Sequence, residues 1–127
     1  RMKKIIKTDK APAPLGPYNQ AVLSGNTLYI SGQIAINPKT EELVVDTIKS
    51  ETLQVMQNLK AVLNAADYSF DDVVKSSIFI SNMDNFVAIN EVYGSFFDDA
   101  IAPARETIQV AKLPKNVNVE ISMIASK

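Results

Sequence analysis

Two charged residues in the C-terminal part of the sequence are the strongest candidates for chemistry. Arg105 is one of only two arginines in a chain whose basic residues are otherwise lysines. A planar guanidinium can bind a carboxylate through two parallel hydrogen bonds, which a lysine cannot do. Glu120 is the only charged residue in the segment 117–126, so its carboxyl group is either exposed or held by a partner. From residue type alone, surface charges or a structural ion pair explain both residues as well.

The chemistry that these residues could perform is carboxylate binding and proton transfer. A glutamate kept from water has a raised pKa and can act as a general base or acid. The sequence contains no histidine and no cysteine, which removes histidine triads, thiol nucleophiles, disulfides and almost every zinc site. The acidic pairs at 41–42, 71–72 and 98–99 are chain neighbours that point apart, and we interpret them as solvated charge.

Composition and charge limit the class of protein. The 127 residues are 46% hydrophobic and 21% charged, which is typical of a single globular domain, here 1–127. A net charge of −1 provides no field that would steer the chain onto nucleic acid or an anionic membrane. The apolar runs are too short for a membrane span, and no signal peptide is recognised. We therefore expect a cytoplasmic protein with neither nucleic acid nor membrane as a partner.

The hydrophobic pattern predicts the elements that must position the candidate residues. Short alternating patterns predict strands at about 19–23, 27–31, 34–36, 73–81, 105–111 and 117–125. Apolar residues spaced three and four apart predict helices at about 46–67 and 85–97. The proline-rich segment 8–17 excludes helix and predicts a stiff loop, either a wall of a site or a plain connector.

The order of these elements predicts an α+β fold with a mixed sheet. Helices stand between strands, so some strands pair in parallel through crossovers. Two helices suffice to cover one face of about six strands and leave the other open. Side chains alternate along a strand, so Arg105 and Thr107 share one side of theirs, and Glu120 and Ser122 share one side of theirs. Because the opposite rows are more apolar, we expect all four residues on the uncovered face.

Six short motifs occur in order between about residues 13 and 125. They are Gly16-Pro17-Tyr18-Asn19-Gln20-Ala21, Ser31-Gly32-Gln33-Ile34, Asn58-Leu59-Lys60-Ala61-Val62-Leu63, Asn90-Glu91-Val92-Tyr93, Pro103-Ala104-Arg105, and Leu113-Pro114-Lys115 with Val119-Glu120-Ile121. Each motif is weak alone, but their order and spacing together resemble the reactive intermediate deaminase family, RidA/YjgF.

The resemblance implies a fold, a reaction and a set of site residues. The fold is chorismate-mutase-like, with a six-stranded mixed sheet, two helices on one face, and a homotrimer with sites between chains. The reaction is hydrolysis of 2-imino acids such as 2-iminobutanoate and 2-iminopropanoate, or their enamine tautomers, to 2-oxo acids and ammonia, without cofactor or metal. Arg105 and Glu120 take the catalytic positions, and the substrate-binding positions fall on Tyr18, Ser31, Gly32, Phe86, Asn90 and Thr107.

Five positions depart from the family pattern, which are Asn19, Ala35, Asp67, Glu106 and Thr107. Thr107 stands where many members have cysteine, and Ala35 stands where proline is frequent, so both concern the range of substrates. Asp67 replaces the glycine expected after the first helix, which weakens a left-handed helix cap by up to about 1 kcal/mol.

Two functions of different classes remain open at this point. One is the imine deaminase, and the other is a regulatory module that binds small carboxylates such as 2-oxo acids without turnover. Both need Arg105, but only the enzyme needs Glu120 to hold or deprotonate a water molecule. An RNA-acting protein is disfavoured by the charge balance.

The uncovered face of the sheet bears on assembly. We expect it to carry Thr107, Gln109, Ser122 and Ile124. Apolar and small polar side chains of this kind are not expected to form a surface that stays exposed to water. Closed symmetry is the usual solution, and the resemblance makes it threefold. The resemblance also places the last strand between the strands that flank the first helix. Arg105 and Glu120 would then lie two strands apart, roughly 10 Å, so we expect Glu120 to reach each site from a neighbouring chain.

Overall fold

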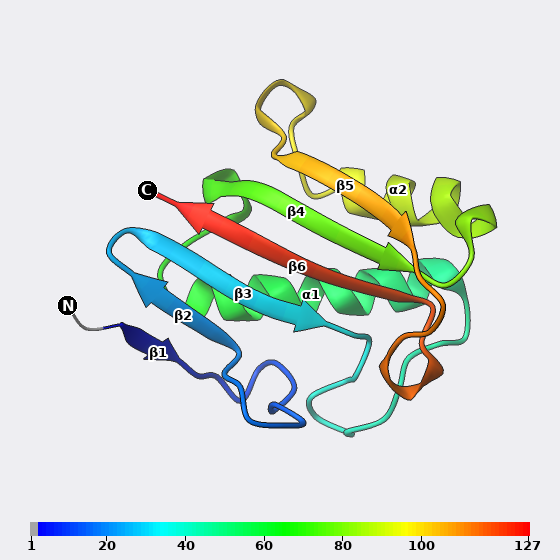
Figure 1. Cartoon of the computed structure of the whole chain (residues 1–127), viewed down its shortest axis with the longest axis horizontal. Helices are drawn as coiled ribbons and strands as arrows, with labels where there is room; N and C mark the ends of the chain where they lie inside the picture. Colours follow the sequence, from blue (N-terminus) through cyan, green and yellow to red (C-terminus); the bar gives the residue numbers. More distant parts are fainter. Residues whose placement is uncertain (1–2) are drawn as a thin grey trace.

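The computed structural model describes residues 3–127 as one mixed sheet with its helices on a single face (Figure 1). The strands are β1 (Lys4–Ile6), β2 (Ala21–Ser24), β3 (Thr27–Gln33), β4 (Val73–Ile80), β5 (Ala104–Gln109) and β6 (Val119–Ser126). Their order in the sheet is β1-β2-β3-β6-β4-β5. Only the β4–β5 pair is parallel within this sheet. The predicted α+β fold with six strands is therefore confirmed.

The first helix, α1 (Ile48–Ala65), begins at a capping box and covers the centre of the sheet. The Thr47 Oγ1 atom accepts a hydrogen bond from the Ser50 backbone N–H at 3.0 Å, which satisfies one of the free N–H groups of the first turn. The apolar stripe of α1 packs into a core formed with the sheet by Val55, Met56, Leu59, Val62, Leu63, Leu28, Ile30, Ile78, Ile121 and Met123. Among residues 3–127, no helix is long and apolar enough to span a membrane.

The last strand fills the centre of the sheet. Both β3 and β4 pair with β6 in antiparallel fashion, so they run parallel to each other with β6 between them (Figure 1). The prediction that the final strand lies between the strands flanking the first helix is confirmed. The second helix, α2 (Phe86–Gly94), makes the parallel crossover from β4 to β5.

One predicted strand is wrong. Residues 34–36 form no strand, and Ile36 makes only an isolated bridge to Leu43. The side-chain amide of Asn58 on α1 instead donates to the carbonyls of Ile34 (3.1 Å) and Ile36 (2.9 Å), which are thus used outside a ladder. The sixth strand is β1, whose short pattern of two isoleucines among lysines gives almost no periodic signal.

The face predicted for Arg105 and Thr107 is also wrong. The parallel register pairs Arg105 with Ser76 and Thr107 with Ile78, and those two β4 residues are buried on the helix side. Gln109 follows them, because its side-chain oxygen accepts from the Met83 backbone N–H beside α2. Strand β5 lies at an edge of the sheet, beside α2, where apolar burial does not decide its orientation.

The termination of α1 gives a prediction about stability. Tyr68 donates its N–H to the Leu63 carbonyl (2.9 Å) and Asp67 donates to Asn64 (3.0 Å), the two bonds of a Schellman motif. Asp67 holds the left-handed position with φ of 61°. We expect Asp67→Gly to raise the free energy of unfolding by about 0.5 to 1 kcal/mol, because glycine adopts this conformation without strain. Urea denaturation measures it; Asp67→Ala should show no such gain, and a glycine variant no more stable than wild type would contradict the argument.

Candidate functional site

A pocket of about 380 Å³ opens where β3 and β6 approach the proline-rich segment. Its lining includes Pro12, Pro14, Tyr18, Ser31, Gly32 and Glu120. Tyr18 and Glu120 are the two titratable side chains among the lining residues. The stiff loop at 8–17 therefore forms a wall of the pocket and is more than a connector.

A buried glutamine holds this wall in place. The side-chain amide of Gln20 is within hydrogen-bond distance of the carbonyls of Thr8 (3.0 Å), Ala11 (3.2 Å) and Pro12 (2.8 Å). Its oxygen accepts the Thr8 backbone N–H at 2.8 Å. Gln20 belongs to one of the six motifs, but the sequence predicts no role for it, because a single buried polar residue leaves no periodic signal.

Two predicted site residues lie at an irregular point of β3. The pairing between β3 and β6 shifts register between Ile30 and Gln33, which places Ser31 and Gly32 in the interruption. The Ser31 hydroxyl donates to the Asn19 carbonyl at 2.6 Å, so it ties the end of β3 to the segment that carries Tyr18. This irregularity leaves room for a side chain from β6 beside Gly32.

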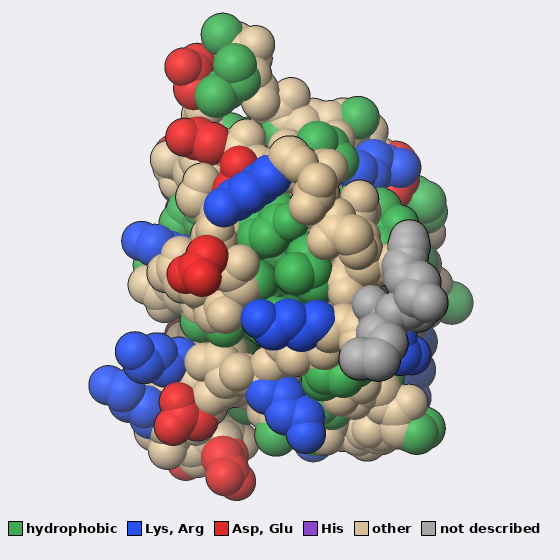
Figure 2. All heavy atoms as spheres, turned by 90° about the vertical axis from the view of Figure 1, so that its left-hand side faces the viewer, with side chains coloured by type: hydrophobic (Ala, Val, Ile, Leu, Met, Phe, Trp, Pro, Cys, Tyr) green, Lys and Arg blue, Asp and Glu red, His purple; other side chains and the backbone are tan. Residues whose placement is uncertain are grey.

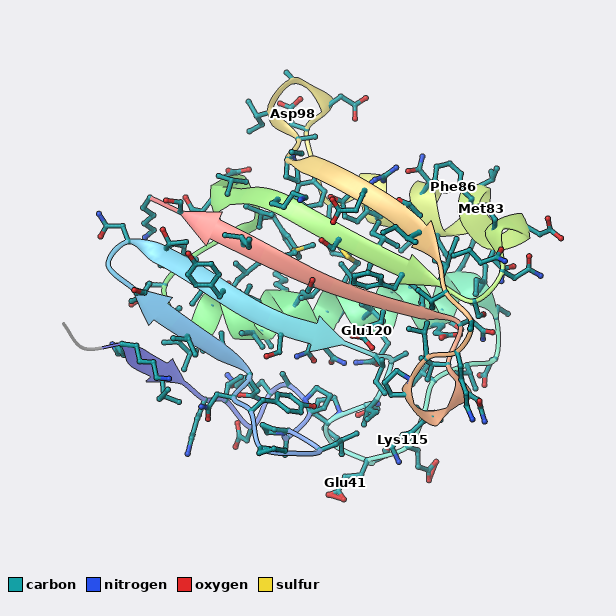
Figure 3. The ribbon with its side chains drawn as sticks, viewed as in Figure 1. Glu41, Met83, Phe86, Asp98, Lys115 and Glu120 are labelled. Carbon is teal, nitrogen blue, oxygen red and sulfur yellow. The ribbon has the colours of Figure 1, made fainter. Side chains whose placement is uncertain are left out.

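That side chain is Glu120, which extends from β6 on the face away from the helices (Figure 3). A Cβ on residue 32 would lie 2.8 Å from the Glu120 Cδ and would overlap its Oε2, so only glycine leaves this space. Partial burial raises the pKa of Glu120 above its ordinary value of 4.5. Within residues 3–127, no lysine or arginine lies within ion-pair distance of this carboxylate.

A second group of predicted residues surrounds Arg105 between β5 and α2. The Arg105 Nη1 atom donates to the Asn90 Oδ1 at 2.7 Å. Its guanidinium carbon lies 5.8 Å from the ring centroid of Phe86 and 5.1 Å from that of Tyr93, both within cation–π range. These contacts orient the guanidinium and use only part of its five donors, so the remaining donors can bind a carboxylate.

Tyr93 supports the group of residues around Arg105, and sequence analysis did not predict it as a site residue. Its hydroxyl donates to the Ser76 Oγ at 2.8 Å, and its ring supports Arg105. Burial raises the pKa of Tyr93, and the Ser76 hydrogen bond and the Arg105 charge offset this only in part. Tyr93 stands in the apolar stripe of the second helix, so its sequence pattern indicates a core residue.

Thr107 follows Arg105 on the same side of β5. Among the described residues, its hydroxyl is a buried side-chain group without a hydrogen-bond partner. An unpaired buried hydroxyl destabilises a protein by about 1 to 3 kcal/mol. The Thr107 hydroxyl therefore has free hydrogen-bonding capacity beside Arg105.

The eight predicted residues thus form two groups of four. Tyr18, Ser31, Gly32 and Glu120 line the pocket on the open side of the sheet. Phe86, Asn90, Arg105 and Thr107 lie on the helix side, and Figure 3 shows Phe86 at α2, away from Glu120. The expectation that Arg105 and Glu120 share a face is wrong, because Arg105 faces α2 and Glu120 faces the open side of the sheet.

The close approach at Gly32 predicts the effect of a methyl group. Gly32→Ala is expected to expel the Glu120 carboxylate from its place and to lower any activity that uses it by at least about 10-fold. Gly94→Ala is the matched control, because a Cβ there meets nothing within 4 Å. Steady-state kinetics of both folded variants measures the difference, and an unaffected Gly32→Ala variant would show that the Glu120 position is not used.

The raised pKa of Glu120 predicts a pH-dependent effect on stability. The native state binds this proton more tightly than the unfolded state, so stability falls as pH rises from the unfolded pKa through the native one. Glu120→Gln is therefore expected to be more stable than wild type at pH 7, and the difference is expected to disappear below the ordinary pKa of 4.5. Urea denaturation at pH 7 and below pH 4.5 checks this. A gain in stability in acid that equals or exceeds the gain at pH 7 would contradict the expectation.

The chain is similar to known proteins over almost its whole length. The model of the family described as Endoribonuclease L-PSP matches residues 8–127. A 2-iminobutanoate/2-iminopropanoate deaminase of Dermatophagoides farinae is 51% identical over 122 residues, covering 96% of this chain and 94% of the relative. A RutC family protein of Pyrococcus horikoshii is 48% identical over 126 residues, covering 99% of each.

Solved structures agree with this placement. RidA from an Antarctic Psychrobacter species superimposes with a TM-score of 0.93 at 44% identity, covering 98% of this chain and 99% of that one. TdcF of E. coli, solved with bound serine, gives a TM-score of 0.91 at 42% identity and covers 98% of both chains. The likeness extends over all six strands and both α-helices described here.

Proposed function

The chain belongs to the Endoribonuclease L-PSP family, which includes RidA, and on that premise we propose that it hydrolyses 2-imino acids to 2-oxo acids and ammonia. One observation carries the proposal. The chain offers a guanidinium oriented by Asn90 and two rings, together with a half-buried carboxylate that has no cation beside it. The deaminase relative at 51% identity supports the same class of reaction.

The chemistry follows from these two groups. Arg105 binds the substrate carboxylate, and the protonated imine carbon is already electrophilic. Glu120 accepts a proton from a water molecule as the water oxygen bonds to that carbon. The resulting carbinolamine then takes that proton on nitrogen. As the C–N bond breaks and ammonia leaves, Glu120 accepts the hydroxyl proton, the C=O bond forms and a 2-oxo acid remains. The proton then passes from Glu120 to ammonia or solvent, which restores the carboxylate. Because Glu120 must be ionised and burial raises its pKa, activity is expected to fall in acid from a pH above 4.5.

We propose that each site combines groups from two chains of a homotrimer. Arg105 lies on the helix side of β5, an edge strand, whereas Glu120 lies on the open face. Neither of the two groups of site residues in one chain therefore contains both side chains. The open face also carries apolar side chains that are half exposed in a single chain, among them Tyr29 (50%) and Ile108 (46%). A neighbouring chain would cover such a surface and bring its Arg105 group to this pocket.

We propose small aliphatic 2-imino acids, 2-iminobutanoate and 2-iminopropanoate, as the substrates. The pocket wall is built of Pro12, Ala13, Pro14, Ile34 and Ile36, which suits a short alkyl chain and offers no charge to a larger polar group. The serine bound to E. coli TdcF shows that this relative accepts a small molecule with a carboxylate.

The decisive experiment measures imine hydrolysis directly. A threonine or serine dehydratase releases the imine, and ammonia or 2-oxo acid formation is followed with and without this protein. We expect acceleration over buffer, and an Arg105→Ala variant serves as the control. If no acceleration occurs but 2-oxobutanoate still binds in calorimetry, the chain is a carboxylate-binding regulatory module instead.

The name of the family model refers to RNA cleavage, and we do not propose that activity for this chain. Acidic and basic side chains are interspersed on the face shown in Figure 2, and the net charge is −1. A surface without an excess of positive charge gains little from releasing the counterions of a phosphate backbone. Single-stranded RNA incubated with the protein should remain intact while imine hydrolysis proceeds.

A further inference from the structure

A buried carboxylate on α1 contacts the beginning of the strand that carries Glu120. Glu51 is 0% exposed. Its Oε2 accepts the backbone N–H groups of Asn118 (2.7 Å) and Val119 (3.2 Å), and its Oε1 accepts the side-chain amide of Asn118 (2.8 Å). All three partners are donors, so the group acts as an acceptor on both oxygens.

This arrangement is an unusual use of a charge. Burying a carboxylate is strongly unfavourable unless hydrogen bonds replace its water. Within residues 3–127, no lysine or arginine is within ion-pair distance of Glu51. Its compensation comes from the three donors and from the first turn of α1, where Glu51 lies and where the helix dipole favours negative charge. The buried carboxylate therefore serves to bind the backbone N–H groups of Asn118 and Val119.

That backbone is the part of β6 with the least support from the sheet. On one side, Val119 and Glu120 pair with Ile80 and Phe79 of β4. On the other side, the pairing with β3 ends at Ile121, next to the irregularity that forms the pocket. Glu51 supplies, from the helix side, the hydrogen bonds that β3 does not supply to residues 118 and 119.

We propose that Glu51 is a positioning residue that fixes the start of β6 so that the Glu120 carboxylate stays over Gly32 at the pocket. The inference rests on the function proposed above for Glu120. Glu51 is not among the residues that line the pocket, and its hydrogen bonds go to residues 118 and 119, so it acts through the backbone there. Its length matters more than its charge, because it must span from α1 to those N–H groups.

Three substitutions of Glu51 test this. Glu51→Met removes all three acceptor contacts, and Glu51→Asp shortens the side chain by one methylene. Both are expected to lower kcat by about 10-fold with KM within about twofold, since a displaced general base affects the chemical step. Glu51→Gln keeps the length and one acceptor oxygen for the two backbone N–H groups, and the Asn118 amide can turn to accept its new donor. This variant is expected to stay within about threefold of wild type.

Thr52→Val is the matched control. Thr52 is the neighbouring residue and is equally buried, but its hydroxyl donates to the Ile48 carbonyl of its own helix at 2.7 Å. We expect wild-type kcat for this variant. A folded Glu51→Asp variant with wild-type kcat, or a loss that appears only in KM, would overturn the proposal even if Glu51→Met fails to fold.

A second readout separates this inference from the proposed function. The titration of the Glu120 carboxyl carbon is followed by NMR in wild type and in each variant. Displacement of Glu120 into water is expected to lower its pKa toward 4.5 in Glu51→Asp and to leave it unchanged in Thr52→Val. If wild type shows no imine hydrolysis, the proposed function fails, and this titration still decides whether Glu51 positions Glu120. An unchanged pKa in Glu51→Asp would refute the positioning role.

Discussion

Arg105→Lys is expected to lower kcat/KM for imine hydrolysis by about 10²-fold or more, equivalent to about 2.7 kcal/mol of transition-state stabilisation. Lysine keeps the positive charge but cannot bind a carboxylate through two parallel hydrogen bonds. It also cannot stack its head group flat against Phe86 and Tyr93 while it donates to Asn90. The substrate carboxylate would still be attracted, but it would no longer be held in one orientation.

The matched control is the same type of change at an exposed position. Lys49 forms a surface ion pair with Glu91 at 3.0 Å, so Lys49→Arg alters the cation without touching either group of site residues. Its kcat/KM should match that of wild type. If a folded Arg105→Lys variant matches it as well, the guanidinium fork is not used and charge alone is sufficient.

Mixing Arg105→Ala chains with Glu120→Ala chains is expected to restore activity that neither variant has alone. If each site takes Arg105 from one chain and Glu120 from its neighbour, random mixing at equal amounts leaves about one quarter of the sites with both residues intact. The chains are mixed by joint unfolding and refolding, and light scattering should report three chains per particle. Native mass spectrometry confirms that mixed particles have formed.

The same experiment can contradict the shared site. If the mixed particles are as inactive as their parents, both residues serve within one chain, and the two-chain arrangement is wrong. A monomeric wild type with full activity would lead to the same conclusion. The arrangement in which Arg105 and Glu120 lie on opposite sides of the sheet makes the first result the expected one.

The central strand and the edge strand show how far sequence alone predicts this fold. In β6 the residues Val119, Ile121 and Met123 are buried, because the strand has neighbours on both sides and α1 above it. Hydrophobic alternation therefore predicts its orientation correctly. In β5 the helix-facing row contains Arg105 and Thr107, because the only element above this edge is α2, which presents Asn90. Alternation predicts which residues share a side there, but not which side.

The candidate site shows a related limit. Six of the eight predicted residues lie in the family motifs, and Phe86 and Thr107 follow from the same resemblance. Their division into two groups depends on the orientation of β5, which no motif encodes. The residues that hold the site were missed for another reason. Gln20 and Glu51 are isolated polar side chains whose partners are backbone groups up to 68 positions away in sequence. Neither periodicity nor local turn chemistry carries information about such long-range bonds.

The central place of β6 also has a consequence for biosynthesis. The ribosome synthesises β3 and β4 well before β6, yet these two strands do not pair with each other. They can be joined into one sheet only when β6 is present. Until then a nascent chain carries two unsatisfied strand edges and an α1 stripe with only part of its apolar partner surface. Pairing that joins distant segments is slow, and exposed edges invite association between chains. The sheet therefore closes only after translation has passed Ser126, and chaperone demand should be greatest in the interval just before.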